Sequence, residues 1–299
     1  MTASERTTFG PETAESILRR ACAVAAVDPD GIQLLRLGDH AVFRIDGGRT
    51  IARAGRGPER LPSVEREVRV AGWLAAEKYP AARLATDAEQ PVVVDGHPVT
   101  FWEGLADGES YATTGEMGVL LRRLHDLGTP DFTLPDLRPF EKVRSRLERA
   151  QISEAARTYL LSLAEELETD FSGLDFALPA GPVHGDFNVG NVLHDNAGQP
   201  RVIDLDGFAL GPREWDLMQT AMYYDSFGWH TEAEYDDFVA GYGWDVRTWS
   251  GYDVMRHVRE LLMVTWLSQN AANPRAAAEV EKRVASLRTG SSRRDWAPY

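Results

Sequence analysis

The sequence predicts an α+β fold with two lobes, a small β-rich lobe followed by a larger helical lobe. Short runs of β-branched and aromatic residues, separated by turn signals, occur around one helical segment in the first hundred or so residues. Segments with helical periodicity dominate the rest of the chain. A length of 299 residues suits two such lobes. We therefore expect a first lobe over residues 1–103 and a second over residues 104–299.

Five short strands are expected in the first lobe. Turn signals at Gly38-Asp39 and Gly47-Gly48 separate the first three strands, and Asp95-Gly96 is a hairpin signal between the last two. Short connections of this kind join antiparallel neighbours. The strands are predicted at residues 32–37, 40–46, 50–54, 91–94 and 99–102.

One main helix is predicted in this lobe, over residues 63–77, with Ser63 as its N-cap. Its apolar residues recur at spacings of three and four, which indicates a helix with one buried face. These residues are Val64, Val68, Ala71 and Leu74. The segment 102–108, with glycines at 104 and 108, suits a hinge between the two lobes.

The second lobe is predicted to be mostly helical. Within its first helix, an apolar stripe at helical spacing defines a buried face, formed by Met117, Leu120, Leu121 and Leu124. The polar, basic stretch 288–294 is expected to be a mobile tail. The helices are expected at residues 113–127, 140–150, 153–168, 212–224, 232–241, 254–270 and 274–287.

Charge and composition exclude several classes of function. The 32 basic and 46 acidic residues leave a net charge of −14, which repels phosphate backbones, so we expect no nucleic-acid partner. Cys22 is the only cysteine, so neither an intrachain disulfide nor a multi-thiolate zinc site can form. An apolar leader and a run of about 18 uncharged apolar residues are both lacking, so we expect no membrane association. These features favour a cytoplasmic protein. Both a monomer and a homodimer are compatible with the sequence.

Residues that suit metal-assisted chemistry gather between positions 182 and 217. A hairpin signal at residues 196–198 returns the chain, so the polar groups before and after it are expected to lie close together. Two carboxylates, Asp186 and Asp204, and the amide oxygen of Asn191 form a set that can hold hard divalent cations while leaving one carboxylate free to act on a substrate hydroxyl. The alternative is that these groups only cap turns and helices. In chain order they are His184, Asp186, Asn191, Asp204 and Asp206.

This pattern resembles the aminoglycoside phosphotransferase and choline kinase-like family. The motif HGD-x4-N at residues 184–191, with IDLD at 203–206, is that family's signature, and it is similar to the catalytic loop and metal-binding aspartate of protein kinases. The resemblance implies a bilobal protein-kinase-like fold, with a five-stranded antiparallel sheet and one main helix in the smaller lobe. It also implies transfer of the γ-phosphate from Mg²⁺-bound ATP or GTP to a small hydroxylated acceptor.

The resemblance implies roles for the catalytic loop. Asp186 is the catalytic base, or the group that orients the acceptor hydroxyl, and His184 braces its loop. Asp216 holds this loop by hydrogen bonds to its backbone. Asn191 acts in catalysis as a ligand of the metal.

The same resemblance implies the metal ligands. Asn191 and Asp204 coordinate the Mg²⁺ that bridges the nucleotide phosphates. Asp206 either reaches a second metal or stabilises the loop.

The resemblance places nucleotide contacts in the first lobe. Gly38 is the single glycine of the nucleotide loop, which departs from the GxGxxG of protein kinases. Arg53 takes the position of the usual phosphate-binding lysine, with a planar fork in place of a point charge. Glu67, rather than Glu65, is expected to pair with it because Glu67 flanks the helix face that meets the sheet.

The linker at residues 101–105 is expected to meet the adenine edge through its backbone, which makes Trp102 and Glu103 nucleotide contacts. His125 lies in a segment that matches a family pattern, and we interpret it as a packing histidine.

Acidic and aromatic residues in the second lobe suggest the acceptor class. They suit a cationic, hydroxylated ligand through charge pairing and cation–π contact, which favours an aminoglycoside or an amino alcohol. The alternative for this group is a solvated helix face. The candidates are Tyr224, Asp225, Trp229 and Glu260.

Other functions stay open. Choline, sugars and macrolides are further acceptors within the same family. The single glycine and Arg53 also allow a nucleotide-binding module with little catalytic activity. A protein kinase is disfavoured because Arg213 follows Asp206 too closely for a peptide-docking activation loop.

Overall fold

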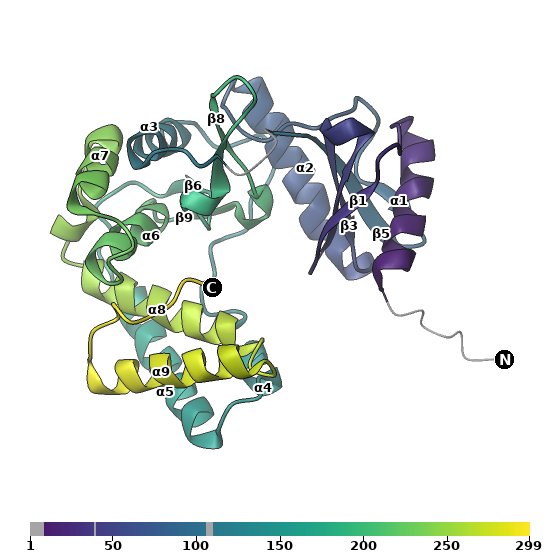
Figure 1. The fold of residues 1–299 in the computed structure, drawn as a ribbon. Coiled ribbons are helices and arrows are strands. Elements are labelled where there is room, and N and C mark those ends of the chain that lie inside the picture. Colours follow the sequence, from purple (N-terminus) through teal and green to yellow (C-terminus); the bar gives the residue numbers. More distant parts are fainter. Residues whose placement is uncertain (1–8, 39, 106–109) are drawn as a thin grey trace. The chain divides into compact units, whose positions relative to one another are not determined.

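The computed structural model describes residues 9–38, 40–105 and 110–299 and divides the chain into two compact units (Figure 1). The first unit comprises Met1–Ala112 and Gly190–Phe208, and the second comprises Thr113–Val189 and Ala209–Tyr299. The predicted α+β class with a five-stranded antiparallel sheet and a mostly helical second part is confirmed. Of the predicted loop and hinge residues, Asp39, Asp107 and Gly108 lie outside the described residues.

The segment 190–208 belongs to the first unit, although the sequence-based boundary places it with the helical lobe. It forms a hairpin of β7 (Val192–His194) and β8 (Pro200–Val202). Main-chain hydrogen bonds attach β8 to the loop before the fourth strand, from Ala82 N to the Val202 carbonyl at 2.8 Å and from Val202 N to the Pro80 carbonyl at 3.0 Å. The hairpin therefore extends the backbone framework of the first unit.

The five-stranded sheet has the order β1-β2-β3-β5-β4, with antiparallel pairing throughout. Turn residues at each predicted reversal leave the strands short and close to their predicted positions. The strands are β1 (Gln33–Leu37), β2 (His40–Ile45), β3 (Thr50–Gly55), β4 (Val92–Val94) and β5 (His97–Glu103).

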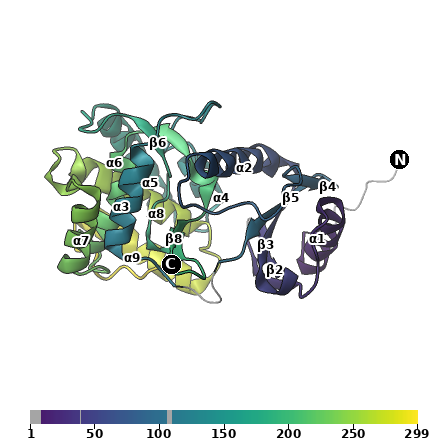
Figure 2. The same cartoon turned by 90° about the horizontal axis from the view of Figure 1, so that it is seen from above.

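Alternation along the strands gives the sheet two different faces. Ala41, Phe43 and Ile45 of β2 are buried, and they belong to an apolar core that includes helix α1 (Pro11–Ala25). Figure 2 shows α1 lying along this face of the sheet. Val42 and Arg44 alternate with these residues, so they point to the opposite face, where the cavity described below lies.

Helix α1 was not predicted, so the expectation of one main helix in this lobe is incomplete. The helix has Pro at its start and an apolar stripe at helical spacing, but four of its six buried residues are alanine or cysteine. Small side chains give a weak periodic signal. The stripe stabilises the fold because the sheet offers it a continuous apolar face.

Helix α2 (Leu61–Ala76) confirms the second predicted helix, but its start differs. It begins at Leu61 with Pro62 in its first turn, which proline favours. Ser63 is therefore inside the helix and does not cap it, since its hydroxyl donates to the Arg60 carbonyl at 2.8 Å. Among the buried residues of this helix is one carboxylate, Glu67.

The helices predicted for the second unit are all present. A two-stranded sheet of β6 (Gly181–Val183) and β9 (Ala209–Gly211), which was not predicted, flanks the segment carrying the catalytic motif. The helices are α3 (Thr114–His125), α4 (Val143–Arg149), α5 (Glu154–Ser172), α6 (Glu214–Asp225), α7 (Glu232–Tyr242), α8 (Tyr252–Ser268) and α9 (Pro274–Thr289). In the described ranges, every helix is too short or too polar to cross a membrane.

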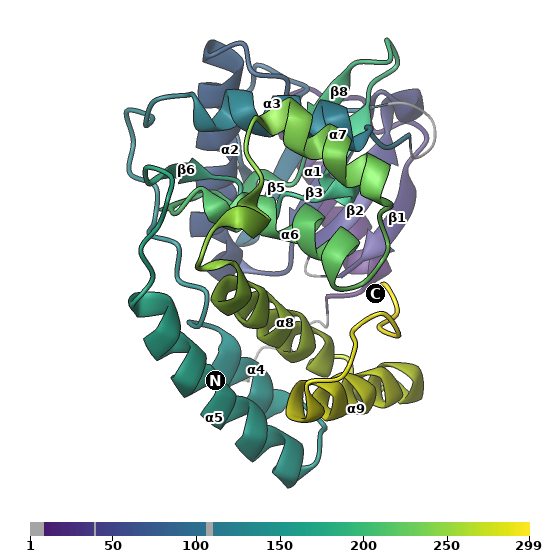
Figure 3. The same cartoon turned by 90° about the vertical axis from the view of Figure 1, so that its left-hand side faces the viewer.

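Helices α3 and α7 pack side by side at very short range (Figure 3). A Cβ atom added at Gly118 would lie 2.3 Å from the Phe238 carbonyl oxygen, and one added at Gly241 would lie 2.5 Å from the Gly115 carbonyl oxygen. The two backbones can approach this closely only because both contact positions lack a side chain.

The expectation of a mobile tail at residues 288–294 is wrong. Helix α9 continues to Thr289, and the chain after it folds back against the second unit. Trp296 is 2% exposed and donates its indole N–H to the Ser286 hydroxyl at 2.8 Å. Arg293, which the sequence suggests is solvated, donates to the buried carboxylate of Glu260 at 3.1 Å. A buried tryptophan therefore anchors the polar stretch that precedes it.

Candidate active site

A cavity of about 470 Å³ lies within the first unit, on the sheet face opposite α1. Its walls come from β1, β2 and β3, from the end of β5, and from the residues that flank the β7–β8 hairpin. Three arginines, Arg36, Arg44 and Arg53, line it. Three carboxylates, Glu67, Glu103 and Asp204, line it as well. Guanidinium groups can bind phosphate oxygens, and carboxylates can hold a metal ion that accompanies them.

Arg53 forms a buried ion pair in this cavity. Its Nη1 donates to Oε1 of Glu67, and its Nη2 lies 3.6 Å from Oδ1 of Asp204. Glu65 is exposed and does not take part, whereas Glu67 is 2% exposed. The pair arises because β3 places Arg53 on the cavity face and α2 turns Glu67 inward.

The pair shifts the pKa of both groups. Burial raises the pKa of the Glu67 carboxyl to about 7, against the opposing effect of Arg53, and the nearby Asp206 and Asp204 add to the rise. Burial also acts to lower the pKa of the Arg53 guanidinium. The carboxylates of Glu67, Asp204 and Asp206 more than offset this effect, so that pKa is raised.

The predicted metal ligands come together in the same unit. The Ile203 N–H donates to the Asn191 carbonyl at 2.9 Å, which joins the segment carrying Asn191 to the one carrying Asp204. Asp204 adopts a left-handed backbone with φ of 61°, an unusual conformation for a residue with a side chain, and its side chain is 42% exposed. The main-chain carbonyl of Asp206 accepts from Arg66 at 3.2 Å.

These oxygen donors fit a magnesium ion held together with a nucleotide. In the part of the chain that the structure describes, no group of three His, Cys, Asp or Glu side chains could hold a metal ion alone. Mg²⁺ usually takes only one or two protein carboxylates and completes its shell with phosphate oxygens and water. The partly exposed Asp204 and the amide of Asn191, both lining the cavity, match that requirement.

Of the three remaining predicted nucleotide contacts, Trp102 and Glu103 line the cavity and Gly38 does not. Trp102 is 5% exposed, donates to the Thr100 hydroxyl at 2.9 Å and lines the cavity together with Glu103. The main-chain N–H groups of Glu103 and Gly104 donate to other backbone carbonyls at 2.8 Å and 2.6 Å, so they do not face a ligand. Gly38 accepts from the Arg56 side chain at 2.5 Å and is not among the lining residues.

The second unit carries the His184-Gly185-Asp186 segment of the predicted catalytic motif on a loop held by Asp216. This carboxylate is 1% exposed and lies in the first turn of α6. It accepts the main-chain N–H groups of His184 at 2.7 Å and Gly185 at 2.9 Å. Gly185 has φ of 87°, a conformation that favours glycine, and its carbonyl accepts the Trp215 indole N–H at 2.8 Å. The backbone of the motif is thus fixed from two sides.

Burial acts to raise the pKa of Asp216. Hydrogen bonds and charge from His125 and His184 outweigh it, so the pKa of this carboxyl is lowered. Asp216 is therefore an ionised group in the interior of the unit.

Asp186 projects from this loop, and its side chain is 54% exposed. Its main-chain N–H donates to Nδ1 of the fully buried His184 at 3.3 Å, and its carbonyl accepts from Asn188 at 3.0 Å. The loop therefore combines a fixed backbone with an accessible carboxylate. Such an arrangement can orient a hydroxyl group or receive its proton.

His125 has a structural setting, in agreement with its interpretation as a packing histidine. Its Nδ1 lies 2.8 Å from the Tyr242 hydroxyl and its Nε2 lies 3.2 Å from Asp216. It is 1% exposed and links α3, α6 and α7.

Sequence reasoning missed Arg259, on α8. Its Nη2 lies 3.8 Å from Oδ1 of Asp186, and its guanidinium carbon lies 4.6 Å from the centre of the Trp215 ring. A usable signal was present, because this arginine stands next to Val258 and four residues after Met255, both fully buried. A charged residue in an apolar helical stripe indicates a buried charge with a partner.

The environment of Glu260 does not fit its predicted role as an acceptor contact. It is fully buried, and its two oxygens accept from Arg256 at 3.2 Å and Arg293 at 3.1 Å. A carboxylate enclosed by two guanidinium groups cannot reach a ligand, so Glu260 has a structural role.

Two further acceptor candidates have internal partners. The Tyr224 ring stacks on Tyr235 with centroids 5.2 Å apart, and the guanidinium of Arg247 lies 5.0 Å from its centroid. Asp225 is exposed and accepts from the Tyr252 hydroxyl at 3.3 Å.

Trp229, the fourth candidate, belongs to an aromatic cluster. It stacks on Phe227 at 4.6 Å and meets Tyr223 edge-on at 4.9 Å. Asp186 and Arg259 are among the charges that affect the pKa of Tyr223, which burial raises. Trp229 therefore lies beside Tyr223, whose hydroxyl is affected by the charges of Asp186 and Arg259.

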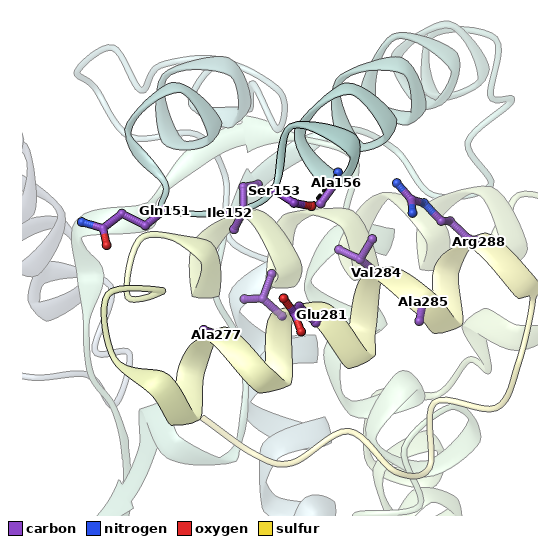
Figure 4. A pocket seen from close by; sticks show the side chains of 10 residues that line it. Gln151, Ile152, Ser153, Ala156, Ala277, Glu281, Val284, Ala285 and Arg288 are labelled. Carbon is purple, nitrogen blue, oxygen red and sulfur yellow. Dashed lines mark hydrogen bonds between the residues drawn. The ribbon is translucent and has the colours of Figure 1, made fainter.

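A second cavity, of about 240 Å³, lies in the second unit between the start of α5 and helix α9 (Figure 4). Its lining is largely aliphatic, with Glu281 and Arg288 as charged members. It contains none of the predicted site residues.

Comparison with known proteins gives a family and a fold. The model of a family described as "Phosphotransferase enzyme family" matches residues 33–258. No match was found among curated protein sequences.

Many solved structures are similar to this chain, and three of them cover 90–95% of it. An amicoumacin kinase in complex with AMP-PNP, Ca²⁺ and Ami has a TM-score of 0.72 at 16% identity, with 95% of each chain covered. An aminopropanol kinase associated with a microcompartment has a TM-score of 0.67 at 20% identity, covering 90% of this chain and 94% of that one. A spectinomycin phosphotransferase in complex with ADP and spectinomycin has a TM-score of 0.65 at 15% identity, covering 91% and 94%. At these identities the likeness establishes the fold.

Proposed function

Because the chain belongs to the phosphotransferase enzyme family, we propose that it is a small-molecule kinase that transfers the γ-phosphoryl group of ATP or GTP to an acceptor hydroxyl. The observation that carries this proposal is the exposed Asp186 carboxylate on a loop whose backbone is bound to the buried Asp216. A loop fixed in this way maintains a reactive carboxylate in one orientation.

The first unit binds the nucleotide in this proposal. Arg53, held by Glu67, contacts phosphate oxygens through its planar fork. Asn191 and Asp204 would hold Mg²⁺, and Asp206 would stabilise their loop or reach a second ion. When bound, Mg²⁺ neutralises negative charge on the phosphates. Trp102 packs beside the base in the 470 Å³ cavity.

The second unit acts on the acceptor. Asp186 accepts a hydrogen bond from the acceptor hydroxyl and takes its proton as the oxygen–phosphorus bond forms and the bond from the γ-phosphorus to its bridging oxygen breaks. His184 and Asp216 do not touch the reacting atoms. They fix the loop through the Asp186 N–H and the His184 N–H, respectively. Asn191 follows Asp186 by five positions, so a short stretch of chain joins the metal-binding and proton-accepting groups.

The acceptor in this proposal is a hydroxylated small molecule with positive charge, such as an aminoglycoside or an amino alcohol. The similar structures include proteins named for spectinomycin and aminopropanol, which supports this range. The exposed Asp225 and the half-buried Trp229 remain candidate contacts, whereas Glu260 does not. Sugars and macrolides are the alternative acceptors.

A nucleotide-binding module with little catalysis is the second candidate. The single glycine of the nucleotide loop and the arginine at position 53 favour it. The presence of Asp186, Asn191 and Asp204 together favours the kinase.

The decisive experiment is the release of ADP and GDP by the purified chain with Mg²⁺, across aminoglycosides, amino alcohols, sugars and macrolides. We expect acceptor-dependent release confined to one class, and none from Asp186→Asn, which should still bind nucleotide. Asp204→Ala should instead weaken Mg²⁺-nucleotide binding itself. Nucleotide binding without release for every acceptor would favour the non-catalytic module, and equal loss of binding in both variants would show that these roles are wrong.

A further inference from the structure

Arg259 is a buried cation directed at the catalytic loop. The residue is 8% exposed, and in the described ranges the one carboxylate within 4 Å of its guanidinium is Asp186, at 3.8 Å. Burying an unpaired guanidinium costs several kcal/mol, so such a group persists only where its surroundings compensate the charge. The carboxylate of Asp186 supplies part of that compensation.

The loop supplies a second partner. The guanidinium lies over the face of Trp215 at 4.6 Å, where the ring's electron density attracts a cation. The same indole donates its N–H to the carbonyl of Gly185, the residue before Asp186. One aromatic ring therefore holds both the Arg259 side chain and the backbone of the motif.

The ion pair with Arg259 acts on the side chain of Asp186. The hydrogen bonds of Asp216 act only on the backbone of the loop. Asp216 binds the N–H groups of His184 and Gly185 and so fixes the backbone of the loop, whereas the Asp186 side chain is 54% exposed. A fixed positive charge 3.8 Å from Oδ1 favours the rotamers that turn this oxygen toward α8.

We propose that Arg259 is a positioning residue that holds Oδ1 of Asp186 toward α8 and so directs the carboxylate at the acceptor hydroxyl. This inference rests on the proposed function, since a positioned carboxylate matters only if Asp186 acts on a hydroxyl. Arg259 acts through Asp186 and does not touch the acceptor.

The test compares three variants. Arg259→Met keeps an unbranched side chain on Trp215 and removes the charge, while Arg259→Lys keeps a charge and loses the planar fork. Arg283→Met is the matched control, because Arg283 is 2% exposed, pairs with Glu279 and lies 4.8 Å over the ring of Trp296, outside the catalytic loop. For each we would measure kcat, the KM for the acceptor, the Kd for Mg²⁺-nucleotide and the Tm.

We expect Arg259→Met to lower kcat about 10- to 100-fold, the effect of a misplaced reacting group, with the acceptor KM and the nucleotide Kd changed less than about twofold. Arg259→Lys should recover much of the rate, and Arg283→Met should lower Tm without this fall in kcat. An unchanged kcat in Arg259→Met would overturn the proposal. The proposal would also be overturned if Arg259→Met and Arg283→Met lowered kcat by the same factor at a similar loss of Tm.

A second measurement separates this inference from the proposed function. If the wild-type chain phosphorylates no acceptor, the kinase assignment fails, whatever the variants do. The contact itself is then tested by urea unfolding of Arg259→Met, Asp186→Asn and the double variant. Midpoint shifts smaller in the double variant than the sum of the two support the coupling, and additive shifts overturn it.

Discussion

The carboxylate of Asp216 accepts the main-chain N–H of His184 at 2.7 Å, which makes a buried charge in helix α6 the support of the loop that carries Asp186. Its position in the first turn of α6 also favours a negative charge there, because a helix N-terminus carries partial positive charge. One buried side chain thus connects a helix, the loop and, through His125, helix α3.

Asp216→Asn should destabilise the protein by roughly 3–5 kcal/mol, as expected when one partner of a buried charged network is lost. The amide nitrogen of asparagine would face N–H donors that now meet a carboxylate oxygen. Urea unfolding of the two proteins at neutral pH measures the difference. A loss below about 1 kcal/mol would show that the network tolerates a neutral group at this position.

Glu67 should make stability depend on pH. Its pKa is about 7 in the folded chain, raised mainly by burial, against about 4.3 when unfolded. The folded state therefore binds the Glu67 proton more tightly, and the stability this provides is complete below about pH 4.3 and lost as pH rises through 7. In Glu67→Gln this component is absent.

The measurement is urea unfolding at several pH values from 4 to 8 without Mg²⁺. The stability of the wild type, relative to that of Glu67→Gln, should fall between pH 4.3 and 7 and level off above. A difference that does not change with pH would mean that Arg53 holds the carboxylate ionised throughout.

Cys22 should react slowly with thiol reagents in the native protein. It is 1% exposed on the face of α1 that packs against the sheet, and burial raises the pKa of its thiol to about 11. The thiolate, which is the reactive form, is therefore scarce at pH 8. Labelling with a chromogenic disulfide should be complete in urea and nearly absent in buffer, and rapid labelling in buffer would show that α1 detaches easily from the sheet.

Gly118→Ala should be destabilising by about 1–3 kcal/mol or more, the cost of inserting a methyl group into close packing. The new Cβ would lie 2.3 Å from the Phe238 carbonyl oxygen, a backbone atom that cannot turn aside. Gly72→Ala, in α2, is the matched control because a Cβ there meets nothing within 4 Å. In this control the free energy of unfolding should rise by up to about 1 kcal/mol, because alanine has the higher helix propensity. Equal effects of the two substitutions on Tm would contradict the close packing of α3 on α7.

Local patterns in the sequence predicted most of the secondary structure. The strands are delimited by Gly and Asp turn signals, and the helices of the second unit have clear apolar stripes, so short-range chemistry was sufficient. The motif from His184 to Asp206 could also be identified from the sequence, because its residues are close together in the chain. Helix α1 was not predicted because the alanines on its buried face are only weakly hydrophobic and contrast little with a polar face.

The partners and the burial of charged residues could not be predicted from the sequence. Sequence alone established which carboxylates follow one another around the hairpin and that an arginine stands in the third strand. Only the tertiary structure decided that Glu260 is enclosed by Arg256 and Arg293 and that Arg259 lies beside Asp186. The physical reason is that the burial of a charge depends on partners from distant segments, and no local pattern records which of them will meet.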